Sequence, residues 1–574
     1  MQASLQGRSM YTRFFSLFFI SLLLLSGTAA AHRCGTAFAA QNLRQQRASG
    51  LVAKQVTLSR GENDCDPRDY YDSVYTRQTD HFQIFYTLDK GPHATTPEFI
   101  DSLAKSLESA FNFHTKIMGM RAPQGIDTTS HYQKPVKKGF YPVEVADIDF
   151  LSDPYYVLKS QMCNGCYGIT YPDSVDSRKS AIIIDNDFQY VPLHSTEMDT
   201  LISNGKTCLH PSAYASLYSN AYGFSYVDEW AKAIRVTAFH ELFHAVQLQY
   251  VNLFRHWSYW IEASATANEE IGAPDINDYI SYIPDFLYSM NTPLSVIGYD
   301  TSKKGDYATS ILYLYLYGNV DKHFDKEIWE SFEKKPTLTI EDHIKKMLDK
   351  RSLSADSVFH DFVTRLALSG ENTKAVDKKL WLWEDQPLWS TARTINTERY
   401  SYYNSSNDGR DEKFEPDTIL YSFAYYSGGS PVIDNYKGRA TALVFKDGKA
   451  DIRPLANTSS LDSINTDSFY ADSIIWIFSR FDSPKIIPEF VRDSTLRAYP
   501  MPWRGSGQLC FTPLPEKKKF IEIRNGRGEL VMREPYSKTT HCIEESLIKE
   551  KMTPGVYRFR AGASGKAEKF LIIY

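Results

Sequence analysis

Two neighbouring runs of helix-forming residues, 228–251 and 260–270, constrain the fold most strongly. The first run contains no proline or glycine and includes His240-Glu241-Leu242-Phe243-His244, which matches the pattern H-E-x-x-H. Residues four apart lie on one face of a helix, so His240 and His244 can offer two imidazole nitrogens to one metal ion. Glu241 projects beside them, where its carboxylate can take a proton from water bound to that ion. The pattern therefore predicts a metal site on a helix.

A third ligand is expected from the second run. A catalytic zinc ion takes three protein ligands and leaves one position open for water, and two histidines with one glutamate form a known set. Glu262 follows His244 by 18 positions and is our first candidate, while Glu269 and Glu270 on the same predicted helix are alternatives. The competing interpretation is that the two histidines are ordinary surface or core residues at this spacing.

Another zinc pattern can be tested on the sequence directly. The metzincin extension requires glycine three residues after the second histidine and a third histidine three residues further on. Gln247 and Tyr250 occupy these positions. The metzincin pattern is therefore excluded, and the pattern with a downstream glutamate remains.

The segments HELFHAVQ and WSYWIEASATANEE resemble a family of gluzincin-type metallopeptidases secreted by bacteria. This resemblance covers roughly residues 75–370 and implies a zincin fold, hydrolysis of peptide bonds, zinc held by His240, His244 and Glu262, and Glu241 as general base. Thermolysin-like members place an aspartate four residues after the glutamate ligand to orient a histidine, and Thr266 stands there in this chain. We expect Glu269, one turn along, to replace it.

Gluzincins often place a tyrosine or histidine on a later helix to stabilise the oxyanion of the tetrahedral intermediate. Tyr307 is our first candidate for this role, with Tyr299 and His256 as rivals. The chain has 38 tyrosines, so a packing role is the simpler interpretation for any single one.

The chain of 574 residues is long enough for several domains. The fold class expected is α+β, with a zincin-like metallopeptidase domain followed by two small all-β, sandwich-like modules. The ranges predicted are a signal peptide at 1–31, a tether or pro-segment at 32–75, the metallopeptidase domain at 76–370, a linker at 371–415, a β-sandwich at 416–495 and a C-terminal β module at 508–574.

Local patterns predict individual elements within these ranges. Residues 182–186 are either a strand that faces an extended substrate or a buried central strand. Strands are predicted at 81–86, 141–145, 180–185, 419–426, 440–445, 473–479, 520–524, 528–531, 555–560 and 569–574, and helices from Thr96 to near Gly119 and at 305–315, 339–349 and 354–369.

Residues 1–31 have the layout of a secretory signal. Arg8 and Arg13 precede an apolar core at 14–25, and Ala29-Ala30-Ala31 is a small-residue cleavage site. An uncleaved N-terminal anchor is the alternative. We therefore expect a secreted or cell-surface protein without a membrane span in the mature chain. The net charge of −5 gives no indication of nucleic-acid binding, and the expected partner is a protein or peptide substrate.

Export makes disulfides possible for the seven cysteines, and their odd number leaves at least one free or paired to another chain. We expect a bridge between Cys510 and Cys542, and Cys34 could pair with Cys65. Cys163 and Cys166 lack the second pair that a zinc ribbon needs, which favours a structural disulfide, with Cys208 as a candidate partner.

The C-terminal residues resemble the sorting domain of the bacterial type IX secretion route, with Gly555-Val556-Tyr557 and a terminal strand at 569–574. This resemblance implies that secretion machinery is a partner; otherwise the module is a small stabilising β domain. The main alternative function for the whole chain is a surface binding or adhesion protein whose zincin domain is structural or inactive. Hydrolysis of a substrate other than a peptide is a further possibility.

Overall fold

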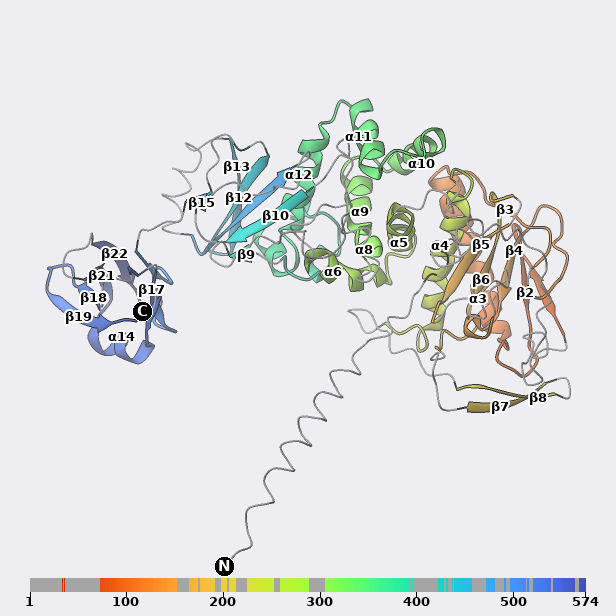
Figure 1. Cartoon of the computed structure of the whole chain (residues 1–574), viewed down its shortest axis with the longest axis horizontal. Helices are drawn as coiled ribbons and strands as arrows, with labels where there is room; N and C mark the ends of the chain where they lie inside the picture. The colour runs from red at the N-terminus through yellow and green to blue at the C-terminus, as the bar shows by residue number, and fades with distance from the viewer. Residues whose placement is uncertain are drawn as a thin grey trace, which may run out of the picture. The chain divides into compact units, whose positions relative to one another are not determined.

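The computed structural model describes Cys34, Thr36 and most of the chain from residue 73 onward (Figure 1). The residues from 73 to 574 that it leaves undescribed are 130, 152–164, 174–175, 191–197, 204–205, 213–223, 252–258, 289–304, 393–394, 397–421, 428–429, 432–435, 437, 457–470, 481–489, 492–495, 513, 516–519, 538–539 and 563–566. The predicted signal peptide and nearly all of the predicted tether lie outside the described residues. No helix in the described part of the chain is both long enough and apolar enough to cross a membrane.

The chain divides into two compact units. The first contains Met1–Trp257 and Asn268–Asp278, and the second contains Ser258–Ala267 and Tyr279–Tyr574. Helix α5, Tyr259–Gly272, is continuous across this division, so its two halves belong to different units. The architecture is a mixed α+β one, as expected, whereas the domain ranges named above stay predictions.

A six-stranded mixed sheet forms the centre of the first unit. Its strands run in the order β1-β2-β4-β6-β3, with β5 also paired to β6. β4 and β6 are almost entirely buried, which explains their apolar sequences YPVEV and KSAIII. The bounds are β1 Tyr75–Gln78, β2 Phe82–Tyr86, β3 Gln124–Gly125, β4 Tyr141–Val145, β5 Gly168–Pro172 and β6 Lys179–Ile184.

Strand β6 is internal in this sheet. β4 pairs with its residues 182–184 in parallel, and β5 pairs with the same residues in antiparallel orientation. Both edges of β6 are therefore occupied by neighbouring strands. Of the two interpretations of 182–186, the buried central strand is the correct one, and an extended peptide would have to add elsewhere.

Two long helices accompany the sheet. α3, Pro97–Asn112, begins as predicted, because the Thr96 side chain accepts a hydrogen bond from the N–H of Phe99 and Pro97 occupies the first turn. A π-helix, η2 Phe113–Ile117, follows it. α4, Trp230–Gln247, packs against α3, β5 and β6 and is buried on nearly every face after its first turn. A hairpin of β7 Met198–Ser203 and β8 Lys206–Pro211, which the sequence analysis missed, also belongs to this unit.

The second unit begins with helices. The predicted helix at 305–315 is two helices, α8 and α9, while those predicted at 339–349 and 354–369 are confirmed as α11 and α12. Thr339 and Asp342 form a capping box at α11, and Ser354 caps α12. The bounds are η4 Asp278–Tyr282, α6 Ile283–Tyr288, α8 Gly305–Ala308, α9 Ser310–Asn319, α10 Phe324–Lys334, α11 Ile340–Lys350 and α12 Ala355–Leu366.

A five-stranded sheet follows, in the order β13-β12-β14-β10-β9. Asp447 and Gly448, both with positive φ, make the tight turn between β12 and β13. One face packs on α12, where the Tyr425 hydroxyl donates to the Val363 carbonyl and Phe423 contacts Phe359. A β-sandwich at 416–495 would place a second sheet on this face, whereas the structure places a helix there. The bounds are β9 Ile395–Asn396, β10 Ser422–Ser427, β12 Arg439–Lys446, β13 Lys449–Leu455 and β14 Ser473–Arg480.

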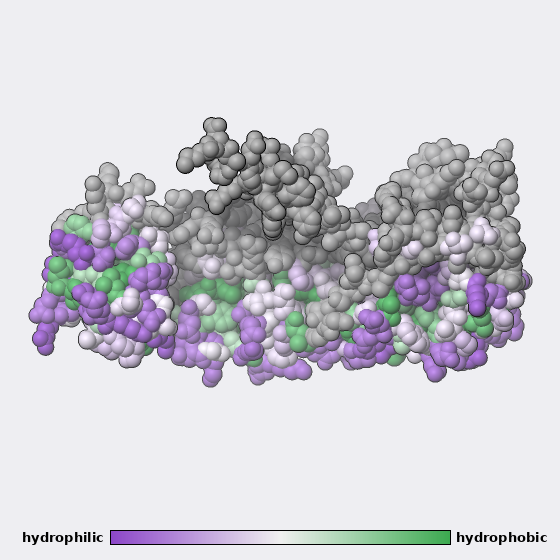
Figure 2. Space-filling model, turned by 90° about the horizontal axis from the view of Figure 1, so that it is seen from below, coloured by the Kyte–Doolittle hydropathy of each residue, from purple (hydrophilic) through white to green (hydrophobic). Residues whose placement is uncertain are grey.

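The C-terminal residues form two antiparallel sheets around one core. The sheets are β16-β17-β20 and β19-β18-β21-β22, and side chains from both, including Phe511 and Phe570, are buried together with Trp503. Figure 2 shows hydrophobic patches among hydrophilic residues on this module, at the left. The bounds are β16 Arg497–Tyr499, β17 Leu509–Thr512, β18 Phe520–Arg524, β19 Leu530–Pro535, β20 His541–Ile543, α14 Glu545–Lys551, β21 Gly555–Ala561 and β22 Glu568–Ile572.

Three cysteine predictions are answered by the described residues. Cys510 and Cys542 form the expected disulfide, which joins directly opposite positions of β17 and β20. Cys166 is disulfide-bonded, as a structural role requires. Cys34 is a free, buried thiol, so the suggested bridge to Cys65 is not formed.

Candidate metal centre

The H-E-x-x-H residues lie in the last two turns of α4, where the helix is enclosed on all sides. His244 and Glu241 have no exposed surface, and His240 is 4% exposed. The neighbouring side chains Phe239, Leu242 and Phe243 are buried as well. Burying polar side chains is costly unless each of them has a partner. The partners of these three side chains therefore indicate which kind of ligand the site can bind.

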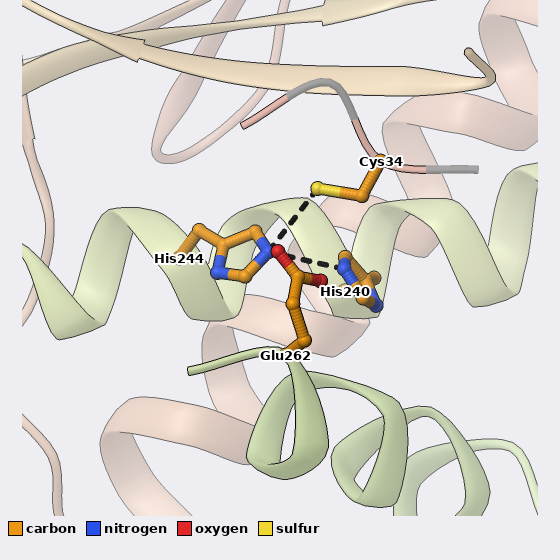
Figure 3. Close-up of side chains that lie close together, drawn as sticks. All are labelled: Cys34, His240, His244 and Glu262. Atoms are coloured by element: carbon orange, nitrogen blue, oxygen red, sulfur yellow. Dashed lines mark hydrogen bonds between the residues drawn. The ribbon is translucent and has the colours of Figure 1, made fainter. Parts of the chain in front are cut away.

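The structure brings both histidines together with Glu262, which lies in the first turn of α5. Ligand atoms of His240, His244, Glu262 and Cys34 all lie within 4.8 Å of one another, and all four residues are buried. Figure 3 shows the four side chains pointing toward a common centre, with Cys34 approaching from a segment outside the two helices. Such a group can hold a metal ion. The sequence analysis predicted the two histidines and Glu262 and missed Cys34.

Hydrogen bonds fix which nitrogen of each imidazole faces the centre. Nδ1 of His240 lies 2.5 Å from Oε1 of Glu269, and Nδ1 of His244 lies 2.8 Å from Oε1 of Gln247. Both partners are acceptors, so each Nδ1 carries the hydrogen and each Nε2 presents a lone pair. The contact expected of Glu269, in place of the aspartate that Thr266 replaces, is present.

The two Nε2 atoms face each other at 3.0 Å. When both imidazoles are neutral, no hydrogen lies between these two nitrogens, and a shared cation removes their repulsion. In a tetrahedral zinc site with bonds of about 2.0–2.1 Å to nitrogen, the two nitrogens are about 3.3–3.4 Å apart. The observed separation is close to that value, so these residues fit a zinc ion.

Glu241 points to a different set of partners. Its Oε2 accepts hydrogen bonds from the hydroxyls of Thr170 at 2.8 Å and Thr36 at 3.1 Å. Its Oε1 has no hydrogen-bond partner among the described residues, although it is buried. The Thr170 hydroxyl also lies 2.7 Å from the backbone carbonyl oxygen of Glu241. The carboxylate is thus held by one oxygen and leaves the other available.

β5 approaches α4 closely because residue 168 is glycine. A Cβ at Gly168 would lie 2.6 Å from Cγ of Glu241 and 2.7 Å from the Thr237 methyl group. Atoms cannot approach so closely without a shift of the helix or the strand. The contact between Thr170 and Glu241 therefore requires a residue without a side chain at position 168.

His114 supports α4 from the side of α3. It lies in η2, and its Nε2–H donates to the carbonyl oxygen of Phe239, one residue before His240. Its ring packs against Phe239 and Phe243. Burial lowers the pKa of His114 to about 3, so this imidazole is neutral at physiological pH.

Tyr307 lies in α8, is 7% exposed and stacks on Tyr282 with ring centroids 5.0 Å apart. This contact is a packing interaction, and its role with an oxyanion stays a prediction. The rival candidates Tyr299 and His256 lie outside the described residues.

No family model matches the chain, and no curated protein matches it.

Sequence reasoning missed Cys34 and the two threonines because they are distant from the motif in the chain. Cys34 and His244 are separated by 210 positions, and Thr170 and Glu241 by 71. The odd number of cysteines was the available signal for Cys34, since it requires one thiol without a partner in the chain. The contact of Gln247 with His244 could have been predicted, because a residue three positions after His244 lies on the same helix face.

Proposed function

We propose that the chain is an exported, zinc-dependent metallopeptidase of the gluzincin type. The observation that carries this proposal is the pair of Nε2 atoms of His240 and His244, which face each other at 3.0 Å beside Glu262. The Nδ1–H of each imidazole is used in a hydrogen bond, to Glu269 or to Gln247, which leaves each Nε2 to face the centre. A general-base candidate, Glu241, lies on the same helix. Burying these polar side chains costs free energy without a cation, and with a zinc ion bound the same side chains act as its ligands.

In this proposal zinc is held by His240, His244 and Glu262. When bound, it would supply Lewis acidity toward a peptide carbonyl and lower the pKa of a water ligand to about 7. Glu241 receives the proton of that water on Oε1, the oxygen without a partner among the described residues, and passes it to the leaving amine. Thr170 holds Oε2 and so keeps the carboxylate from rotating.

Two further groups are assigned by the same proposal. Glu269 orients His240 and increases the basicity of its Nε2, as a carboxylate behind a ligand histidine does in zinc sites. Tyr307 is proposed to donate to the oxyanion of the tetrahedral intermediate. The substrate of the proposed peptidase is a protein or peptide.

We propose export by the signal at 1–31 and recognition of the C-terminal module by type IX secretion machinery. Val556 and Tyr574, two hydrophobic side chains of this module, are 51% and 55% exposed and are the residues that such a contact would cover.

The proposal is tested by comparing the chain with Glu241→Gln. We expect both to bind one zinc ion, measured by mass spectrometry of the native protein. Casein cleavage is compared in the background Cys34→Ser as well, because the Cys34 thiol reaches the same site, and there only the chain with Glu241 should cleave. Equal cleavage by the variant with zinc still bound would contradict the assignment of Glu241.

A second candidate function is a surface binding protein whose metal site is structural. One observation favours it: the four-residue group includes Cys34, and a zinc site with four protein ligands is the structural type. For such a protein, the unchanged chain and Glu241→Gln should both bind zinc and neither should cleave casein. Removal of the Cys34 thiol should not produce cleavage either.

A further inference from the structure

The fourth member of the ligand group comes from a segment near the N-terminus. Sγ of Cys34 lies 3.3 Å from Nε2 of His244 and accepts a hydrogen bond from the N–H of Thr36 at 3.4 Å. The thiol is free and buried. A tetrahedral zinc ion with bonds of about 2.3 Å to sulfur and about 2.0–2.1 Å to nitrogen places these atoms about 3.5 Å apart. The sulfur thus lies where a fourth ligand would bind.

The same segment engages the proposed general base. The Thr36 hydroxyl donates to Oε2 of Glu241 at 3.1 Å and accepts from the backbone N–H of Thr170 at 2.9 Å. Two residues of one short segment therefore contact a proposed metal ligand, the proposed base and β5.

The contact with β5 is made at the edge that faces away from β6. The Tyr167 carbonyl and the Asp173 N–H, which flank β5, both bond to the β6 side of the sheet, to the Asp185 N–H and the Lys179 carbonyl. Backbone groups alternate along a strand, so Gly168 and Thr170 present theirs to the opposite edge. Cys34 forms a parallel bridge with Gly168 there, and Thr170 bonds to Thr36. Extended peptides add to a sheet at such an edge.

We propose that the segment carrying Cys34 and Thr36 is a built-in inhibitor that keeps the peptidase latent. The Cys34 thiolate takes the fourth ligand position, with the thiol proton released to solvent, and no place is left for water. Thr36 holds the base, and Cys34 and Thr36 occupy the edge of β5 that a substrate would use. This inference rests on the proposed peptidase function, and activation then requires that the segment leave the site.

The latent state differs from a structural site in what removal of the thiol does. In a latent peptidase, Cys34→Ser opens a ligand position on a site that still has three ligands. In a structural site, the same change weakens a centre that needs all four. The serine hydroxyl is close in size to the thiol, so the packing around residue 34 is preserved.

The experiment compares the full chain, Cys34→Ser and the control Cys65→Ser, the other cysteine of the N-terminal segment. Each is prepared with zinc and with cobalt in place of zinc. The readouts are the thiolate-to-cobalt charge-transfer absorption in the near ultraviolet, bound metal per chain, and cleavage of casein. Zinc-edge X-ray absorption of the unchanged chain supplies a readout that needs no variant, a sulfur neighbour at about 2.3 Å.

We expect the charge-transfer absorption and the sulfur neighbour in the unchanged chain, the absorption retained in Cys65→Ser, and its loss in Cys34→Ser. Cys34→Ser should still bind one metal ion and cleave casein faster than the unchanged chain. Addition of Glu241→Gln to that variant should abolish the gained cleavage.

Absence of a sulfur neighbour in the unchanged chain would overturn the inference and leave the peptidase proposal standing. Loss of zinc from Cys34→Ser would overturn it in favour of a structural site. A sulfur neighbour, retained zinc and no cleavage by Cys34→Ser would overturn the peptidase proposal, and latency with it, while Cys34 would stand as a ligand.

Discussion

Oε1 of Glu269 lies 2.5 Å from Nδ1 of His240, two turns along α5 from Glu262. One helix therefore carries both a proposed metal ligand and the carboxylate that orients another ligand. The division of labour follows from helical spacing, because residues seven apart lie on nearly the same face.

Glu269→Gln should weaken zinc binding by about 10- to 100-fold, because the amide has no charge to increase the basicity of His240. The measurement is a competition titration against a chelator that reports free zinc. Glu270→Gln removes the same charge from the neighbouring position and serves as the control. Equal weakening in both variants would show that net charge, and not the contact with His240, determines the affinity.

Gly168→Ala should destabilise the fold by about 1–3 kcal/mol, because its Cβ would lie 2.6 Å from Cγ of Glu241. The midpoint of thermal unfolding measures this loss. Gly526→Ala is the control, since the nearest heavy atom to its added Cβ is the Val556 carbonyl oxygen, 3.7 Å away. An unchanged melting temperature in Gly168→Ala would contradict the close approach of β5 to α4.

Acid should destabilise the first unit through two buried histidines. Burial lowers the pKa of His114 to about 3, and burial together with the nearby His131 lowers the pKa of His93 to about 3. The unfolded chain binds these protons below about pH 6.5, whereas the folded chain does so only near pH 3. Between these values the free energy of unfolding falls as the pH falls, by about 1.4 kcal/mol per pH unit for each histidine.

His114→Phe should flatten this dependence by one histidine's share, even though the loss of the hydrogen bond to Phe239 lowers stability at neutral pH. Melting temperatures from pH 7 to pH 4, taken with a chelator present, give the slope. His323→Asn replaces an exposed histidine and is the control. A slope identical to that of the unchanged chain would show that His114 is not the titrating group.

Replacing both Cys510 and Cys542 with serine should destabilise the C-terminal module by about 3–4 kcal/mol, the chain-entropy value for a loop of this length. The disulfide closes a sequence separation of 32 residues. Calorimetry of the two chains measures the loss in the transition of this module. If α4 amides exchanged faster by the same factor, the two regions would unfold together and the effect could not be assigned to the module alone.

Local patterns predicted the elements that local physics determines. Thr96 and Pro97 mark the start of α3 because capping and ring geometry act within one turn, and Thr339 with Asp342 does the same for α11. The central position of β6 could not be read from Ile182–Ile184, because an apolar run is equally suited to a central strand and to an edge.

The candidate site divides in the same way. His240, His244, Glu262 and Glu269 were predicted because they lie on two helices close in sequence. Cys34, Thr36 and Thr170 enter through the pairing of a distant segment with β5, and no spacing rule connects them to the motif. Their roles depend on the tertiary fold alone.

The Thr170 hydroxyl has a single hydrogen and two oxygens of Glu241 within reach, the carboxylate Oε2 at 2.8 Å and the backbone carbonyl at 2.7 Å. While the carboxylate is charged, the hydrogen favours Oε2. Once a proton has arrived on Oε1, Oε2 carries less negative charge, and the hydroxyl can turn its hydrogen to the backbone carbonyl oxygen instead. Rotation about the Cβ–Oγ1 bond of Thr170 would then accommodate both protonation states of Glu241 without displacing the helix.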